Sequence, residues 1–112
     1  MSAELNSTLI ERIRKSFDRQ SAMQLIKATL HAVDRGHVEI HLEHWSGIEQ
    51  QHGFVHGGVV GMIADSAAGY AAMTTAPEDA SVLTVEYKIN LLAPADSEKL
   101  VAKGKVIRPG RA

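Results

Sequence analysis

A single acidic side chain, Asp65, interrupts a long apolar segment of this 112-residue chain. It is the only charged side chain between Glu49 and Glu78, and no Lys or Arg lies near it in sequence. Burying an unpaired carboxylate is costly, so such a group is usually either held by hydrogen bonds or used in chemistry. Spacing alone leaves both interpretations open. Asp65 can be a helix residue bonded to Ser66 or to the backbone, or it can be a general base or nucleophile.

Three residues with a possible binding role, His56, Gly57 and Gly58, stand upstream of Asp65 at the start of the same apolar segment. If a helix begins there, its first amide hydrogens have no intrahelical acceptor and its dipole favours negative charge, so a carbonyl oxygen that gains charge can bind. A tight turn is the simpler explanation of the glycines alone. Gly57 and Asp65 are eight residues apart, or about 12 Å of helical rise. A site that uses both groups therefore points to two chains side by side.

The spacing of apolar residues predicts the elements that must position these groups. Helical spacing after a Thr8–Glu11 capping box predicts an amphipathic helix, and strict alternation of apolar and polar residues predicts strands. The predicted elements are a helix over 8–19, strands over 26–32 and 37–43, a helix over 57–73, and strands over 83–91 and 99–106. The turn at 34–36 should join the first two strands into an antiparallel hairpin. The order α-β-β-α-β-β predicts an α+β fold with antiparallel pairing.

The predicted helix over 57–73 is rich in Gly and Ala. Each glycine costs about 1 kcal/mol of helix propensity relative to alanine, so tertiary packing must offset that cost. A sheet that curls closely around the helix would do so, because small side chains let two backbones approach each other.

Composition narrows the class of protein. The length suits one domain, and the 45% hydrophobic content suits a globular core. A net charge of -1 without a basic patch makes nucleic acid an unexpected partner. Cysteine is absent and the N-terminus lacks a secretory pattern, so we expect a cytoplasmic protein. Asp65 cuts the apolar run well short of the ~20 residues that span a bilayer, so we expect no membrane partner.

Several segments resemble one family. The run from Gln50 to Gly58, the following Asp65, and the later segments 84–87 and 92–95 are similar to the hotdog-fold acyl-CoA thioesterases of the phenylacetic-acid-pathway (PaaI-like) type. The resemblance extends from the first helix to the last residue. It implies a hotdog fold, in which an antiparallel sheet wraps a long central helix. It also implies homodimers or dimers of dimers with sites between subunits, an acyl-CoA substrate, and no cofactor.

The resemblance also implies roles for individual residues. The Gly57 amide would polarise the thioester carbonyl, and Asp65 of the neighbouring chain would be the nucleophile or the general base that activates water. Gln50 stands where many relatives have Asn and would orient the thioester or the water. Thr84 stands where relatives place Ser or Thr to position the nucleophile or the water.

Four further residues are expected to bind substrate: His56, Gly58, Arg108 and Arg111. His56 belongs to the start of the helix and would be structural or orienting. The two arginines pair well with CoA phosphates, although a solvated turn explains them equally well.

The six histidines do not predict a metal site. His37 and His41 fall on the polar face of a predicted strand beside Glu39 and Glu43, where a solvated surface accounts for them. A pair formed by His52 and His56 would need a helix that the intervening glycine disfavours.

The sequence thus predicts an acyl-CoA thioesterase that hydrolyses an acyl- or aryl-acyl-CoA. A non-catalytic acyl-CoA or acyl-carrier binding protein would keep Gly57 without requiring Asp65. A hotdog dehydratase ranks last, because that chemistry pairs a His with a carboxylate in another arrangement. Relatives continue past the equivalent of Ala112 with about two more strands, so we expect residues 1–112 to form a single but C-terminally incomplete hotdog domain, with poor stability and little activity if it acts alone.

Overall fold

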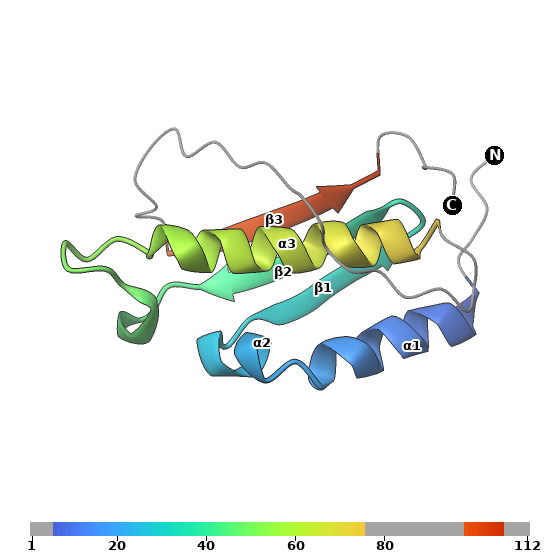
Figure 1. The fold of residues 1–112 in the computed structure, drawn as a ribbon, viewed down its shortest axis with the longest axis horizontal. Coiled ribbons are helices and arrows are strands. Elements are labelled where there is room, and N and C mark those ends of the chain that lie inside the picture. Colours follow the sequence, from blue (N-terminus) through green and yellow to red (C-terminus); the bar gives the residue numbers. More distant parts are fainter. Residues whose placement is uncertain (1–5, 76–97, 107–112) are drawn as a thin grey trace.

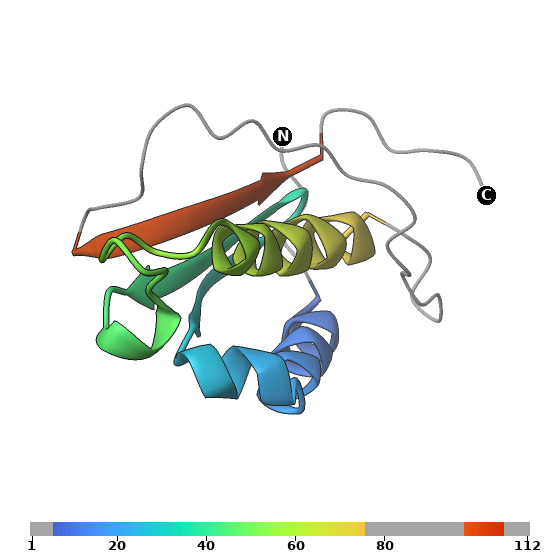
Figure 2. The same ribbon diagram turned by 60° about the vertical axis from the view of Figure 1, so that its left-hand side comes forward.

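The computed structural model describes residues 6–75 and 98–106, which form helices and one antiparallel sheet. The elements are α1 (Ser7–Asp18), α2 (Ser21–Ile26), β1 (Thr29–Asp34), β2 (His37–Glu43), the short 3-10 helix η1 (Ser46–Ile48), α3 (Gly57–Met73) and β3 (Lys99–Lys105). Helix α3 lies along one face of the sheet, and α1 and α2 lie on the β1 side of the molecule (Figures 1 and 2). Within the described ranges, no helix has both the length and the apolar character needed to cross a membrane.

The first helix forms as predicted, with a different N-cap. The side chain of Asn6 accepts a hydrogen bond from the Thr8 amide at 2.7 Å. Helix α1 therefore begins at Ser7, one residue before the start at Thr8 that the capping-box pattern predicted. Leu9, Ile13 and Phe17 recur at helical spacing and are buried. Their burial against the sheet and α3 explains why an amphipathic segment is helical here.

The first strand was predicted to begin at Ile26, and that start is wrong. Ile26 is the last residue of a helix over 21–26, α2, which forms because Met23 and Ile26 fall on one helical face and are both buried. Lys27 ends the helix in the left-handed conformation, with a φ of 65°, and β1 begins at Thr29. The alternation at 26–32 therefore predicted the strand correctly only in its second half.

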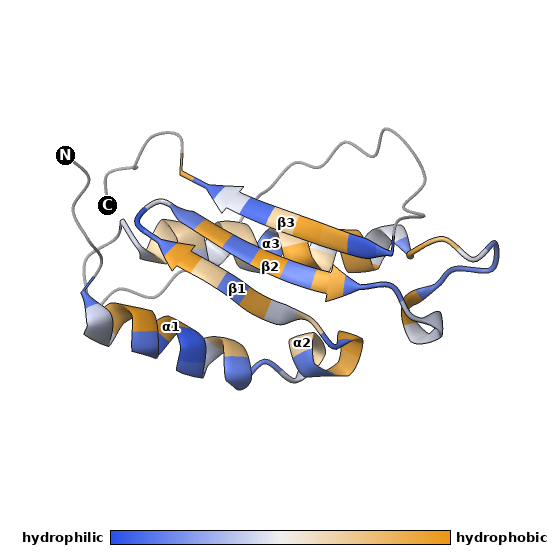
Figure 3. Ribbon diagram, turned by 180° about the vertical axis from the view of Figure 1, so that it is seen from behind, coloured by the Kyte–Doolittle hydropathy of each residue, from blue (hydrophilic) through white to orange (hydrophobic). Residues whose placement is uncertain are grey.

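The predicted hairpin is confirmed, and β2 is its central strand. The sheet order is β1-β2-β3 with antiparallel pairing throughout. Val38, Ile40 and Leu42 point inward from β2 and are almost fully buried. Figure 3 shows the opposite, outer face of the sheet, which no described helix covers. The last predicted strand is confirmed as β3, whereas the strand predicted over 83–91 lies outside the described residues.

The predicted helix over 57–73 is confirmed as α3, and its small residues allow the close approach expected of them. Gly104 of β3 lies directly against the backbone of α3, so that a Cβ atom built on it would overlap the Ala67 carbonyl. Ala67 and Ala71 are almost completely buried. Helix and sheet are thus held in backbone contact, which fixes the position of every residue on α3 relative to the strands.

This contact makes a prediction about stability. Gly104→Ala should lower the free energy of unfolding by about 1–3 kcal/mol, because the added methyl group meets backbone that cannot rotate away. Gly69→Ala is the matched control on α3: a Cβ there meets no atom within 4 Å, so helix propensity should raise stability by up to about 1 kcal/mol. Urea denaturation of both variants measures the difference. Equal effects of the two substitutions would contradict the packing described.

Candidate active site

A narrow loop fixes the start of α3. After η1, the Gln50 amide donates to the Phe54 carbonyl at 2.8 Å and the His56 amide donates to the Ile48 carbonyl at 2.9 Å. The Gln50 side-chain oxygen also accepts from the amides of His52 and Phe54. The side-chain oxygen of Gln50 is therefore occupied inside the loop, and its side-chain NH2 group remains available to bind a ligand.

The N-terminus of α3 has one capped amide and one without an acceptor. His56 is the N-cap, and its Nδ1 accepts a hydrogen bond from the Gly58 amide at 2.8 Å. A side chain at Gly58 would crowd the imidazole ring, so the second glycine lets His56 fold over the helix end. Within the described residues, the Gly57 amide donates to no acceptor. This amide is thus available to a negatively charged oxygen.

Asp65 lies two turns further along α3, at a cavity of about 240 Å³ between α1 and α3. The cavity is lined by Ser16, Gln20, Asp65, Ser66, Gly69, Tyr70 and Met73. Asp65 Oδ1 is buried and has no hydrogen-bond partner among the described residues. The expected alternative, a bond to Ser66, is not made, because the Ser66 hydroxyl donates to Gln20 Oε1 at 3.4 Å. A buried carboxylate oxygen left without a donor is unusual and is typical of groups kept for function.

A polar network beside Asp65 was not predicted from the sequence. Gln20 Nε2 donates to the Tyr70 hydroxyl at 2.8 Å, and the Ser16 and Tyr70 hydroxyls lie 3.0 Å apart. Ser66 and Tyr70 are four residues apart on α3 and share one helix face, but Ser16 lies on α1 and Gln20 lies between α1 and α2, so no single spacing in the sequence predicts the network. Tertiary packing of α1 on α3 brings these residues together.

The structure does not bring all the predicted site residues together in one place. Gly57 and Asp65 belong to one continuous helix and stay about 12 Å apart along its axis, as the spacing predicted. Gln50, His56 and Gly58 cluster with Gly57 at the helix start. Three other predicted residues, Thr84, Arg108 and Arg111, lie outside the described residues. Within one chain, the free amide of Gly57 and the carboxylate of Asp65 therefore stay apart.

With the fold and the geometry of these residues described, sequence comparison identifies the family. Residues 52–112 match the thioesterase superfamily, a segment that includes Gly57 and Asp65. The chain is also 41% identical to a thioesterase family protein from Silicibacter pomeroyi, with a TM-score of 0.88 over 92% of this chain and 76% of that one. The chain therefore belongs to the thioesterase superfamily. No curated protein matches it significantly.

More distant solved structures share the fold. The Escherichia coli PaaI protein from the phenylacetic acid degradation operon is 18% identical, with a TM-score of 0.83 over 96% of this chain and 76% of that one. A thioesterase from Haemophilus influenzae is 24% identical, with a TM-score of 0.79 over 90% of this chain and 70% of that one. The helix packed on an antiparallel sheet is thus the hotdog fold, which confirms the predicted fold class.

The unpartnered oxygen of Asp65 predicts a gain in stability when the carboxylate is removed. Asp65→Ala should raise the free energy of unfolding by about 1–3 kcal/mol, because it abolishes a buried acceptor without a donor. Ser66→Ala is the matched control: it brings a similar gain in helix propensity but loses the bond to Gln20, so it should be nearly neutral. Chemical denaturation at one fixed protein concentration compares the two. A destabilised Asp65→Ala variant would show that Asp65 is structural.

Proposed function

We propose that this protein hydrolyses an acyl- or aryl-acyl-CoA thioester, and that each active site combines Gly57 of one subunit with Asp65 of another. The proposal rests chiefly on one observation: α3 carries an amide without an acceptor at its start and a carboxylate oxygen without a donor two turns later. Neither group can satisfy the other within a chain. A second copy beside the first can place the two groups on either side of one thioester.

The free amide suits the electrophilic half of the reaction. Attack on a thioester puts negative charge on the carbonyl oxygen, and a fixed amide at a helix start stabilises that charge without reorganising. His56 contributes indirectly, because its ring occupies the neighbouring Gly58 amide and caps the helix. Gln50 holds the preceding loop in place and can direct its side-chain NH2 group to the substrate.

The carboxylate suits the nucleophilic half. Asp65 either accepts a proton from water as the water oxygen attacks, or attacks the carbonyl itself to form a mixed anhydride that water then opens. In both routes the carbon–sulfur bond breaks, CoA leaves as the thiol, and the acyl group leaves as the free acid. Both routes require the ionised carboxylate.

The cavity beside Asp65 limits what binds there. Its volume of about 240 Å³ is below that of pockets that enclose whole drug-sized ligands, which is ~300–1,000 Å³. A CoA thioester cannot enter it entire. The cavity can receive water and part of the acyl group, while the nucleotide portion must lie elsewhere. Ser16, Gln20 and Tyr70 would then contact the acyl group and influence the choice of substrate.

The role of Asp65 is tested by Asp65→Asn. The substitution keeps the shape of the side chain but removes its charge, so turnover of acyl-CoA should fall by about 100-fold or more while the fold is retained. Release of free thiol from a panel of acyl- and aryl-acyl-CoA substrates measures turnover, with Asp18→Asn on the exposed end of α1 as the control. Hydrolysis by Asp65→Asn at the wild-type rate would refute the catalytic role and favour a protein that only binds the thioester.

The role of the Gly57 amide is tested by Gly57→Pro. Gly57 is the first residue of α3, a position where proline is favoured, and the φ and ψ of His56, -59° and 133°, are those that precede a proline. The substitution thus removes the N–H group and retains the helix. Turnover should fall by about 10²–10³-fold.

Gly57→Ala is the matched control, because it adds a side chain but keeps the amide, and it should retain far more activity than the proline variant. Circular dichroism should show equal helix content in both variants. A proline variant as active as the alanine variant would show that this amide does not bind the carbonyl oxygen.

A further inference from the structure

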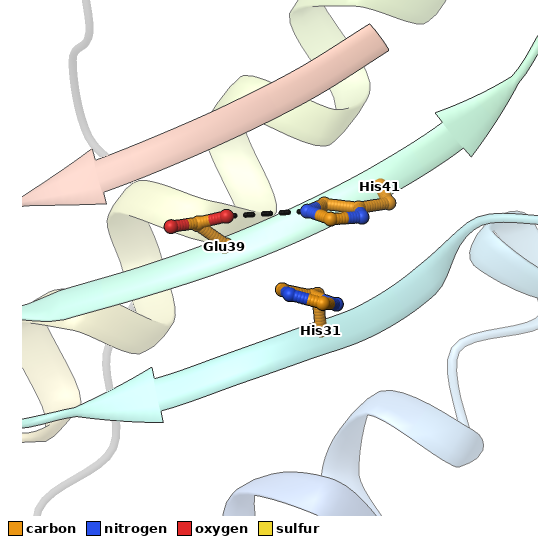
Figure 4. Close-up of side chains that lie close together, drawn as sticks. All are labelled: His31, Glu39 and His41. Atoms are coloured by element: carbon orange, nitrogen blue, oxygen red, sulfur yellow. Dashed lines mark hydrogen bonds and ion pairs between the residues drawn. The ribbon is translucent and has the colours of Figure 1, made fainter. Parts of the chain in front are cut away.

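A second cluster of chemically active side chains lies on the outer face of the sheet. His31 of β1 and Glu39 and His41 of β2 each direct one potential ligand atom to a common region, and these atoms lie within 4.8 Å of one another (Figure 4). The rings of His31 and His41 are stacked, with their centroids 3.8 Å apart and their planes 15° from parallel. Glu39 Oε1 lies 3.1 Å from His41 Nε2.

An irregularity in β1 creates this cluster. The pairing of β1 with β2 runs from Leu30 opposite Ile40 directly to Ala32 opposite Glu39, so His31 is the extra residue of a β-bulge. A bulge redirects side chains and is frequent beside functional sites. Here Val33, after the bulge, is buried in the core, and His31 stacks on His41 on the exposed side.

The carboxylate in the cluster contacts two histidines. Glu39 Oε2 lies 3.1 Å from His37 Nε2, and Glu39 Oε1 lies 3.1 Å from His41 Nε2. Two imidazoles and one carboxylate are a familiar ligand set for divalent transition metals.

We propose that His31, Glu39 and His41 bind one divalent first-row transition-metal ion, for which Zn²⁺ is the natural probe. Neighbouring ligand atoms around a tetrahedral zinc are about 3.3 Å apart, close to the 3.1 Å between Glu39 and His41. His31 is exposed, so its ring can rotate to complete the set. The ion would replace the direct bond between Glu39 and His41.

A metal held by three protein ligands has a free coordination position. His31 and His41 also line a groove of about 540 Å³, so this position is accessible to water or to a ligand in the groove. Three ligands plus an open position is the arrangement of reactive rather than purely structural zinc sites.

Calorimetric titration of the whole metal-free protein with Zn²⁺ tests the proposal, and its outcome does not depend on thioesterase activity. The wild type should bind one equivalent per chain. His31→Asn and Glu39→Gln should each weaken binding by at least about tenfold, the lower bound of what even an outer-shell partner of a metal contributes. His31 is exposed and its substitution should leave the fold intact, which circular dichroism checks.

His52→Asn is the matched control, since His52 is an exposed histidine in the loop before α3 and outside the cluster. It should bind Zn²⁺ as the wild type does. Titration with Co²⁺ provides a second measurement, because a four- or five-coordinate site gives intense visible absorption that His31→Asn should abolish. Absence of Zn²⁺ binding, or equal binding by the wild type and His31→Asn, would overturn the proposal. The cluster would then be only a set of hydrogen-bonded and stacked side chains on the surface.

Discussion

The backbone contact between α3 and β3 is the constraint on which the rest of the structure depends. Because Gly104 places the strand directly on the helix at Ala67, the sheet and α3 form one rigid unit. A rigid helix keeps its residues at fixed separations, so Gly57 and Asp65 cannot approach each other by bending. The packing therefore holds α3 in place on the sheet, and the helical rise keeps Gly57 and Asp65 about 12 Å apart along it.

The two groups of the proposed site differ in what holds them. The Gly57 amide is defined by backbone geometry: the loop ending at Val55 and the His56 cap orient it, and no side chain of its own is needed. The Asp65 carboxylate is defined by packing against α1, which encloses a cavity and leaves one oxygen buried without a donor.

Much of the fold was predictable from the sequence, and the exceptions have physical causes. The bounds of α3 and β2 follow from strong, uniform patterns, and both were predicted correctly. The start of the first strand was misplaced at Ile26 instead of Thr29, because over so short a segment the period alone does not separate helix from strand. Among the site residues, the spacing from Gly57 to Asp65 was readable from the sequence. The polar network around Tyr70 and the stacking of His31 on His41 were not, because both arise from tertiary contacts and a bulge.

The central claim is that each active site is shared by two chains, and complementation between inactive subunits tests it most directly. Asp65→Asn chains and Gly57→Pro chains, carrying different tags, are co-expressed and the mixed species is purified. In a two-fold symmetric pair of unlike chains, one site has both substitutions and the other has neither. If the site is shared, the purified mixed dimer should recover about half of the wild-type turnover per dimer, while each variant alone is nearly inactive. A purified mixed dimer without activity would contradict a site built from Gly57 of one chain and Asp65 of the other.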